Sequence, residues 1–353
     1  MSSTDRLIRA PAEAQDQPIA RIDGPQDQVS VPAISAIIEP SKSVVPPASG
    51  EVIESKATGN TYIMGEWIGE GYFGLVFDCV DTWGNQLAAK VLKPLRTYEE
   101  IRASAQSELQ KLFVVRHPYV TYVFDAFEYR DTFYIITERC FRSLSDLLAQ
   151  GDEAFHAELW LKPIARCLLQ AVHFIHFNGL VHQDIHLGNV FVSFARDESD
   201  SAEAGSIQFK LGDLGVAKLF SEIDAAHTRG WMLPPEVIDP REFGKPDHRI
   251  DVYHCGLLFL QLAYGKELKF TVGEIRAGKP REMALHLPAP LNFALEKALR
   301  RHVVDRTASA MELWRDLTSL ATEELAPATL ETPAESEKVD VPAGPDVGSA
   351  PEA

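Results

Sequence analysis

The sequence predicts an α+β protein with two lobes, in which a small antiparallel β-sheet lobe with one main helix precedes a larger and mainly helical lobe. Three features predict this arrangement. Short apolar runs of strand length come first, long stretches with helical period follow, and both ends of the chain show no period. The 353 residues, of which 45% are hydrophobic, are enough for a sizeable core.

The first lobe is expected over residues 59–140. In Glu99–Phe113 apolar residues recur at helical spacing, which predicts the one main helix of this lobe. Five short apolar runs bounded by turn-forming residues are expected to form its sheet. These predicted strands are Tyr62–Ile68, Leu75–Val80, Gln86–Leu92, Val120–Phe127 and Phe133–Thr137.

The second lobe is expected over residues 141–320, where long stretches have the apolar period of a helix. Residues 1–58 and 321–353 are rich in Pro, Ala and polar residues and cannot bury enough apolar surface to offset the entropy of ordering the chain. We therefore expect two disordered tails, the second of them acidic. The predicted helices of the second lobe are Ala157–Phe177, Val252–Leu262, Leu291–Arg300 and Ala308–Leu320.

Charge and cysteine content narrow the class of protein. The formal net charge of -17 argues against a nucleic-acid partner, because a phosphate backbone repels an acidic surface. The four cysteines stand far apart without a C-x-x-C pair, and we expect them to be reduced thiols. The first residues lack an apolar signal segment, and the longest apolar stretch, Val252–Tyr264, is too short to span a bilayer. We therefore expect a cytoplasmic protein with no membrane span.

A glycine-rich turn joins the first two predicted strands. Residues 69–76 read G-E-G-Y-F-G-L-V and fit the pattern G-x-G-x-x-G-x-V, in which backbone without side chains can close over phosphate groups. A plain turn is the alternative, whereas a dinucleotide-binding fold is disfavoured because a strand and not a helix follows. The candidate phosphate-binding residues are Gly69, Glu70, Gly71, Tyr72, Phe73 and Gly74.

Lys90 stands inside the apolar strand Gln86–Leu92. A lysine in such a strand is costly to bury unless a partner neutralises its charge. Glu108, on the predicted helix, is the expected partner. Alone, this pair would be an ordinary surface pair. Beside the glycine-rich turn, we interpret Lys90 as the residue that holds the α- and β-phosphates and Glu108 as the residue that orients it.

Two segments of the second lobe complete a recognisable set. His182–Asn189 reads H-Q-D-I-H-L-G-N, and residues 213–215 read D-L-G. With the glycine-rich turn and Lys90, these elements occur in the order found in eukaryotic-type protein kinases, and the chain resembles the serine/threonine kinases of that superfamily over residues 61–320. The resemblance implies the protein-kinase fold, the cofactors ATP and Mg²⁺, with Mn²⁺ as a substitute, and transfer of the γ-phosphate to Ser/Thr hydroxyls of protein substrates.

The same resemblance implies a role for each matching residue. Asp184 is expected to be the catalytic base, while Asn189 and Asp213 are expected to bind the metal ions. The expected catalytic residues are Asp184, Lys90, Glu108, Asn189 and His186. The expected adenine site consists of Val76 and Ala88 above the ring, Phe191 below it, the gatekeeper Thr137, and the hinge with Glu138 and Cys140.

Further matches lie outside the nucleotide site. Glu236, in the sequence P-P-E, and Arg306 stand where the family has an architectural ion pair. Asp251 stands where the family has an aspartate that anchors the backbone of the catalytic loop. Small-molecule phosphotransferases generally lack these elements. Their presence in this sequence therefore favours a protein kinase.

Two residues depart from the family pattern. Gln183 replaces the usual arginine, which makes control by phosphorylation of the activation loop less expected. His186 replaces a lysine that steadies the transferring phosphate; a histidine can donate a hydrogen bond and carries part of a positive charge near neutral pH. Two alternatives to an active protein kinase therefore stay open. One is a weakly active kinase or pseudokinase that serves as a nucleotide-binding interaction module, and the other is a phosphotransferase of the aminoglycoside or choline type.

Overall fold

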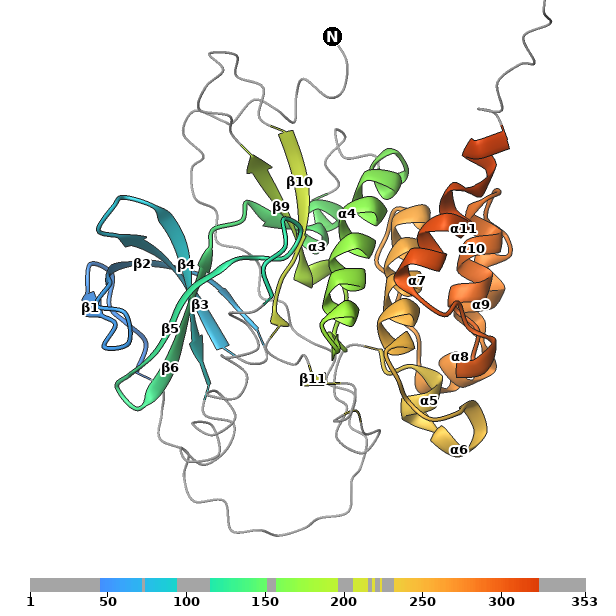
Figure 1. The fold of residues 1–353 in the computed structure, drawn as a ribbon, viewed down its shortest axis with the longest axis horizontal. Coiled ribbons are helices and arrows are strands. Elements are labelled where there is room, and N and C mark those ends of the chain that lie inside the picture. The colour runs from blue at the N-terminus through green and yellow to red at the C-terminus, as the bar shows by residue number, and fades with distance from the viewer. Residues whose placement is uncertain are drawn as a thin grey trace, which may run out of the picture.

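The computed structural model describes residues 45–71, 74–93, 115–150, 157–195, 206–214, 218–219, 223 and 232–323. Within them, an antiparallel sheet forms one end of the molecule and a group of helices forms the other (Figure 1). The predicted α+β class with a sheet lobe and a helical lobe is confirmed. The predicted helix at Glu99–Phe113 lies outside the described residues.

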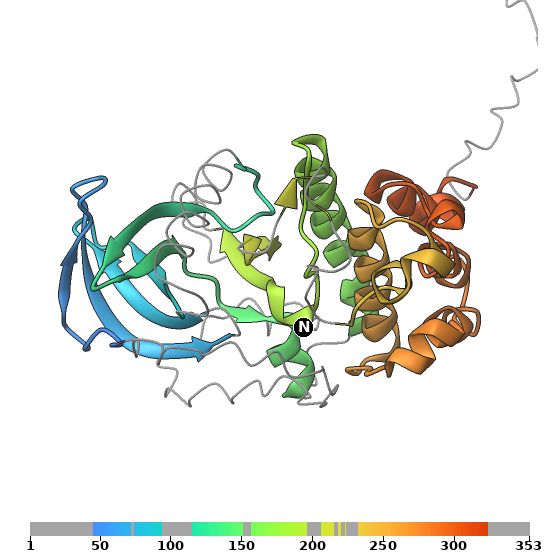
Figure 2. The ribbon, with the colours of Figure 1, turned by 90° about the horizontal axis from the view of Figure 1, so that it is seen from below.

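The N-terminal lobe is a six-stranded sheet with the order β1-β2-β3-β4-β6-β5, in which all neighbours are antiparallel. The sheet is curled, as Figure 2 shows from below. Its strands are β1 (Val52–Glu54), β2 (Thr61–Glu70), β3 (Gly74–Asp81), β4 (Gln86–Leu92), β5 (Val123–Tyr129) and β6 (Thr132–Glu138). The five predicted strands correspond to β2 to β6.

One face of this sheet carries the core of the N-terminal lobe. Side chains alternate between the two faces along a strand, so Phe77 and Cys79 of β3 lie on the same face as Leu87, Ala89 and Val91 of β4. All five are buried in one hydrophobic cluster. The opposite face is therefore the one that can carry Lys90 and other functional side chains.

The sheet begins earlier than the predicted boundary at residue 59, because β1 pairs with β2 and buries Ile53 completely. The turn between the two strands is tied to β5. Asp125, a buried carboxylate, accepts hydrogen bonds from Thr58 Oγ1 at 2.5 Å and Tyr62 Oη at 2.9 Å. The sequence pattern missed β1 because three residues are too few to show a period.

The C-terminal lobe begins with β7 and contains all the α-helices of the described residues. Helix α4 covers the range that its helical period predicts, and α11 continues to Glu323, past the expected boundary at residue 320. The elements are β7 (Arg142–Ser143), α3 (Leu144–Ala149), α4 (Ala157–Phe177), β8 (Leu180–Val181), the 3₁₀ turn η1 (Leu187–Asn189), β9 (Val190–Ala195), β10 (Ser206–Leu211), β11 (Lys218–Leu219), α5 (Pro235–Ile238), α6 (Pro240–Phe243), α7 (Arg249–Tyr264), α8 (Val272–Ala277), α9 (Lys279–Ala284), α10 (Leu291–Ala298), η4 (Val303–Asp305) and α11 (Ala310–Glu323).

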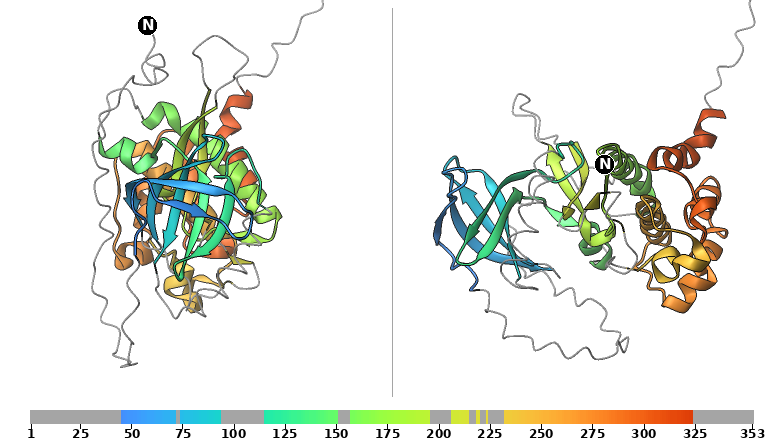
Figure 3. Two further views of the ribbon diagram at one scale, coloured as in Figure 1. Left: turned by 90° about the vertical axis from the view of Figure 1, so that its left-hand side faces the viewer. Right: turned by 60° about the horizontal axis from the view of Figure 1, so that its bottom comes forward.

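Helix α7 lies at the centre of this lobe, between α4 and the helices near the C-terminal end of the described chain (Figure 1). It is buried on all sides from Ile250 to Leu262, as expected for a hydrophobic helix inside a core. Gly265, in the left-handed conformation, ends it. The hairpin of β9 and β10 lies between α4 and the N-terminal sheet (Figure 3) and so carries its residues to the junction of the lobes.

None of the helices in the described part of the chain has both the length and the apolar character needed to cross a membrane. All four cysteines lie in that part and are free thiols.

Candidate active site

The two lobes are joined by an ion pair between Lys90 and Asp213. Lys90 extends from β4 of the N-terminal lobe, and Asp213 follows β10 of the C-terminal lobe. The Lys90 Nζ and Asp213 Oδ1 atoms are 2.5 Å apart. The lysine that the sequence singled out thus contacts the predicted metal-binding carboxylate. Glu108, its predicted partner, lies outside the described residues.

Asp213 is held as a carboxylate. Burial raises its pKa, but the charge of Lys90 and the hydrogen bond from it lower the pKa by more, so the pKa lies below its usual value. The φ angle of Asp213 is 56°, a left-handed conformation that few residues other than glycine adopt. The backbone turn at this point aims the carboxylate at the N-terminal lobe.

Residues 182–189, the predicted catalytic loop, bring the predicted base and the predicted metal-binding amide together. Asn189 Nδ2 donates to the backbone oxygen of Asp184 at 2.9 Å and lies 3.4 Å from Asp184 Oδ2. Because the amide nitrogen is used inside the loop, the amide oxygen is the Asn189 atom suited to a cation.

Asp251 of α7 fixes the start of this loop. Its two carboxylate oxygens accept hydrogen bonds from the backbone N–H of His182 at 2.8 Å and of Gln183 at 2.7 Å. His176 Nε2 lies 2.8 Å from the oxygen that His182 uses. Burial raises the pKa of Asp251, yet the hydrogen bonds and charges of His176 and His182 together lower it further, so the pKa lies below its usual value. The anchoring role that the resemblance implied for Asp251 is confirmed by these contacts.

His182 connects the loop to Asp213. Its buried ring has Nε2 at 2.9 Å from the Gly212 carbonyl, so Nε2 carries the proton. Its Nδ1 then accepts from the backbone N–H of Asp184 at 3.3 Å. Gly212 leaves room for the predicted adenine-site residue Phe191, since a Cβ there would lie 2.6 Å from Phe191 Cε2.

His186 lies beside the predicted base. Its Nδ1 accepts a hydrogen bond from the backbone N–H of Gly188 at 3.0 Å, so the proton of the neutral ring sits on Nε2. That Nε2 atom is 3.7 Å from Asp184 Oδ2. This position of the histidine ring needs a glycine at residue 188, because a Cβ there would lie 2.9 Å from the ring.

The predicted adenine residues of the N-terminal lobe share one sheet face with Lys90. Val76 is paired with Lys90, and Ala88 is paired with Thr137, so all four side chains project to the same side. The Thr137 hydroxyl is 3.5 Å from the Ala88 carbonyl. Cys140 is half-buried, and burial raises the pKa of its thiol to about 12, so the thiol is protonated.

The glycine-rich turn is held closed at its base. The Gly71 N–H donates to the Gly74 carbonyl at 2.9 Å, and a Cβ on Gly74 would lie 2.6 Å from the Val91 carbonyl of β4. Lys93 Nζ lies 2.6 Å from Glu70 Oε1 and donates to the Gly71 carbonyl at 3.0 Å. The sequence did not single out Lys93. Tyr72 and Phe73 lie outside the described residues.

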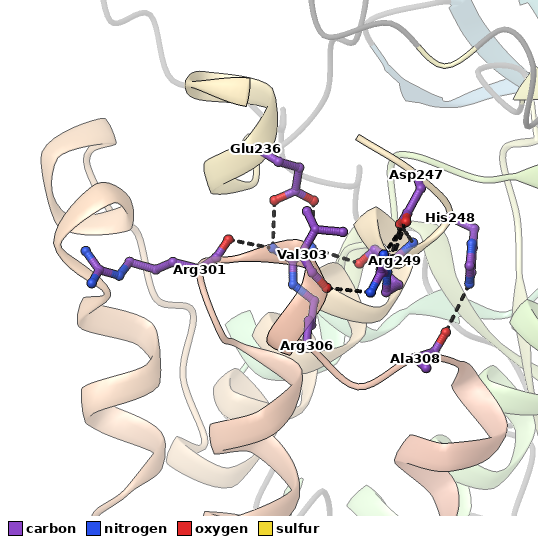
Figure 4. A network of polar contacts seen from close by, with 8 residues as sticks. All are labelled: Glu236, Asp247, His248, Arg249, Arg301, Val303, Arg306 and Ala308. Atoms are coloured by element: carbon purple, nitrogen blue, oxygen red, sulfur yellow. Dashed lines mark hydrogen bonds and ion pairs between the residues drawn. The ribbon is translucent and has the colours of Figure 1, made fainter. Parts of the chain in front are cut away.

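The architectural pair Glu236 and Arg306 is present, and both side chains are completely buried. The guanidinium donates to both carboxylate oxygens at 2.6 Å and also donates to the Arg300 carbonyl at 3.0 Å. Figure 4 shows Arg306 pointing toward Glu236 of α5, with Arg249 held next to it between Asp247 and the Val303 carbonyl. The pair connects α5 with the segment that follows η4.

The comparison with protein families agrees with this arrangement. The sequence model of the protein kinase domain matches residues 62–302, which is more than half of the chain. The chain belongs to the protein kinase domain family.

Curated relatives carry the same domain. Serine/threonine-protein kinase TAO3 of Rattus norvegicus is 26% identical over 212 residues, which are 60% of this chain and 22% of that protein. Serine/threonine-protein kinase TAO2 of Homo sapiens is also 26% identical over 212 residues, here 16% of that protein. Serine/threonine-protein kinase PLK2 of Rattus norvegicus is 24% identical over 272 residues, which are 74% of this chain and 38% of that protein. The chain thus spans less than half of the length of each of these relatives.

Proposed function

We propose that this chain is a protein serine/threonine kinase that transfers the γ-phosphate of ATP, with Mg²⁺, to hydroxyl groups of protein substrates. The observation that supports this most strongly is the contact of Lys90 from one lobe with Asp213 from the other, next to a catalytic loop in which Asp184 and Asn189 touch. The names of the curated relatives support serine or threonine as the acceptor.

The donor set fits a magnesium ion. Asp213 offers an ionised carboxylate and Asn189 an amide oxygen, and both are the oxygen ligands that Mg²⁺ prefers, alongside phosphate oxygens and water. Bound there, the metal would neutralise phosphate charge. The Lys90 ammonium, which pairs with Asp213, is placed to share its charge between that carboxylate and the phosphates.

Asp184 is assigned to accept the proton of the substrate hydroxyl group. As the substrate hydroxyl oxygen forms its bond to the γ-phosphorus, the bond from that phosphorus to the bridging oxygen of ADP breaks, and the hydroxyl proton passes to the Asp184 carboxylate. Asn189 keeps the loop in position through its bond to the Asp184 carbonyl. His186, with its Nε2 proton beside Asp184, is assigned to donate to the transferring phosphate in place of the lysine of related kinases.

A transfer assay tests the proposal. Purified protein with labelled ATP and Mg²⁺ should label itself or a general protein substrate, and Asp184→Asn should lower that rate by a factor of about 10² to 10⁴. Binding of ADP should change little in the variant, because no phosphate contact is assigned to Asp184. Binding of ADP without any transfer to protein would favour the interaction-module alternative, and transfer only to amino sugars or choline would favour the small-molecule alternative.

A further inference from the structure

A second ion pair crosses the junction of the lobes, on the side of the hinge. Lys210 of β10 has its Nζ 2.8 Å from Oε1 and 2.6 Å from Oε2 of Glu138, the last residue of β6. Glu138 Oε1 also accepts from the backbone N–H of Tyr122 at 2.7 Å. The side chain of Lys210 is 15% exposed and that of Glu138 is 19% exposed, so water screens the pair only in part.

The strand that carries Lys210 also leads to the metal-binding carboxylate. Leu211, the next residue of β10, donates to the Tyr119 carbonyl at 2.8 Å and accepts from the Thr121 N–H at 2.9 Å. Asp213, just beyond, contacts Lys90. The end of β10 is therefore bound to the hinge by Lys210 and to the N-terminal sheet by Asp213.

Glu138 connects β10 with the predicted adenine site, because its side chain bonds Lys210 and its backbone continues into the hinge. Its backbone N–H donates to the Tyr122 carbonyl at 2.9 Å, and its backbone leads directly into residues 139 and 140 of the hinge. Glu138, at the start of the hinge, is thus held at its side chain by Lys210 and at its backbone by Tyr122. Loss of the lysine would leave a mostly buried carboxylate with the Tyr122 N–H, which disfavours the present position of Glu138.

We propose that Lys210 and Glu138 are positioning residues that keep the adenine-binding hinge in register with Asp213, so that nucleotide affinity depends on the ion pair of their side chains as well as on the residues that contact the nucleotide. The inference rests on the proposed nucleotide-binding function. It assigns no chemical step to Lys210. A lysine at this place serves affinity for ATP and not the rate of phosphate transfer.

The test compares nucleotide affinity in matched variants of the full chain. Calorimetric titration with ADP and Mg²⁺ should give a dissociation constant about five to ten times higher for Lys210→Met than for wild type. The KM for ATP should rise by a similar factor, whereas kcat should stay within about twofold. Lys210→Arg restores the charge and should bind ADP within about twofold of wild type.

Lys297→Met is the matched control. Lys297 forms an ion pair of similar burial with Asp316, at 2.8 Å and with side-chain exposures of 23% and 16%, in the helical lobe. This variant should lose thermal stability to a similar degree as Lys210→Met and should keep the wild-type affinity for ADP. Its result separates a general loss of stability from a loss of hinge position.

Glu138→Gln gives a second variant if Lys210→Met does not fold. The amide keeps an oxygen for the Tyr122 N–H and removes only the charge, and it should also raise the dissociation constant of ADP. Wild-type affinity in Glu138→Gln, or in a folded Lys210→Met, would overturn the inference. Absence of ADP binding in the wild type would instead overturn the proposed function.

Discussion

His186 stands where the family resemblance implies a lysine, and its surroundings explain how a histidine can stand there. The ring is fixed by the Gly188 N–H on one side and faces Asp184 on the other. A lysine has no acceptor for that N–H, whereas the imidazole supplies both an acceptor and a donor. The sequence indicated the substitution, but the direction of the ring depends on the local turn of η1.

The role of His186 is tested by His186→Lys. If the ring serves as the donor to the transferring phosphate, the ammonium of a lysine can take over that contact, and kcat should equal or exceed that of wild type. His186→Ala removes the donor and should lower kcat by about ten- to a hundredfold, with a smaller change in the KM for ATP. Steady-state kinetics of both variants measure this. A large loss in His186→Lys would show that the imidazole has a task that a lysine cannot fill.

At the scale of elements, the catalytic loop depends on its attachment to α7. Asp251 accepts two backbone N–H groups of the loop and one contact from His176 of α4, so a single carboxylate connects two helices with the loop. Its pKa lies below the ordinary value of 3.8, since His176 and His182 together outweigh the effect of burial. A carboxyl group with a lowered pKa stabilises the fold at pH above its ordinary value, and this contribution is lost as the pH falls through the folded value.

Asp251→Asn should therefore show a stability deficit that depends on pH. At pH 7 the variant should lose about 2 to 4 kcal/mol of unfolding free energy, because charged hydrogen bonds in a buried place are lost. Below about pH 4 the deficit should shrink, because the carboxyl group then takes up a proton in the unfolded wild type before it does so in the folded protein. Urea unfolding of both proteins from pH 7 to pH 3 measures it. A deficit of the same size at every pH would contradict the assigned charge state.

The sequence predicted elements well where the pattern was long and poorly where it was short. The period of α4 extends over the whole helix, so its range could be predicted, whereas β1 is too brief for a pattern. Lys90 was found because a lysine inside an apolar strand is unusual. Lys210 was missed because the alternation along β10, with Phe209 buried, resembles that of a strand with a solvent-facing lysine. Its partner Glu138 is distant in sequence, and only the folded chain joins them.

At the scale of the whole molecule, partly or fully buried ion pairs connect parts that are distant in the sequence. Two ion pairs of the described residues join the lobes, namely Lys90 with Asp213 and Lys210 with Glu138. A third pair, Arg306 with Glu236, connects α5 with the segment that follows η4. The last pair is the most buried of the three, and the guanidinium also lies 4.8 Å from the centre of the Tyr253 ring. The planar guanidinium donates to both Glu236 oxygens and to backbone carbonyls at the same time.

Arg306→Lys should destabilise the protein although the charge is kept. A lysine cannot bond both Glu236 oxygens and the backbone carbonyls in the geometry of a guanidinium, so the unfolding free energy should fall by about 2 to 4 kcal/mol. Arg276→Lys is the control, since its ion pair with Glu242 is exposed and the same change there should cost less than about 1 kcal/mol. Chemical unfolding measures both. Equal losses of unfolding free energy in the two variants would show that the buried pair contributes no more to stability than the exposed pair.

The central claim is that Lys90, Asp184, Asn189 and Asp213 surround one nucleotide and its magnesium. The most direct measurement is the affinity for a non-hydrolysable ATP analogue in the presence of Mg²⁺ and in the presence of a chelator. Wild type should bind the analogue more tightly with Mg²⁺, and Asp213→Asn should bind it equally in both conditions. No binding by the wild type, or an undiminished effect of Mg²⁺ in Asp213→Asn, would contradict the claim.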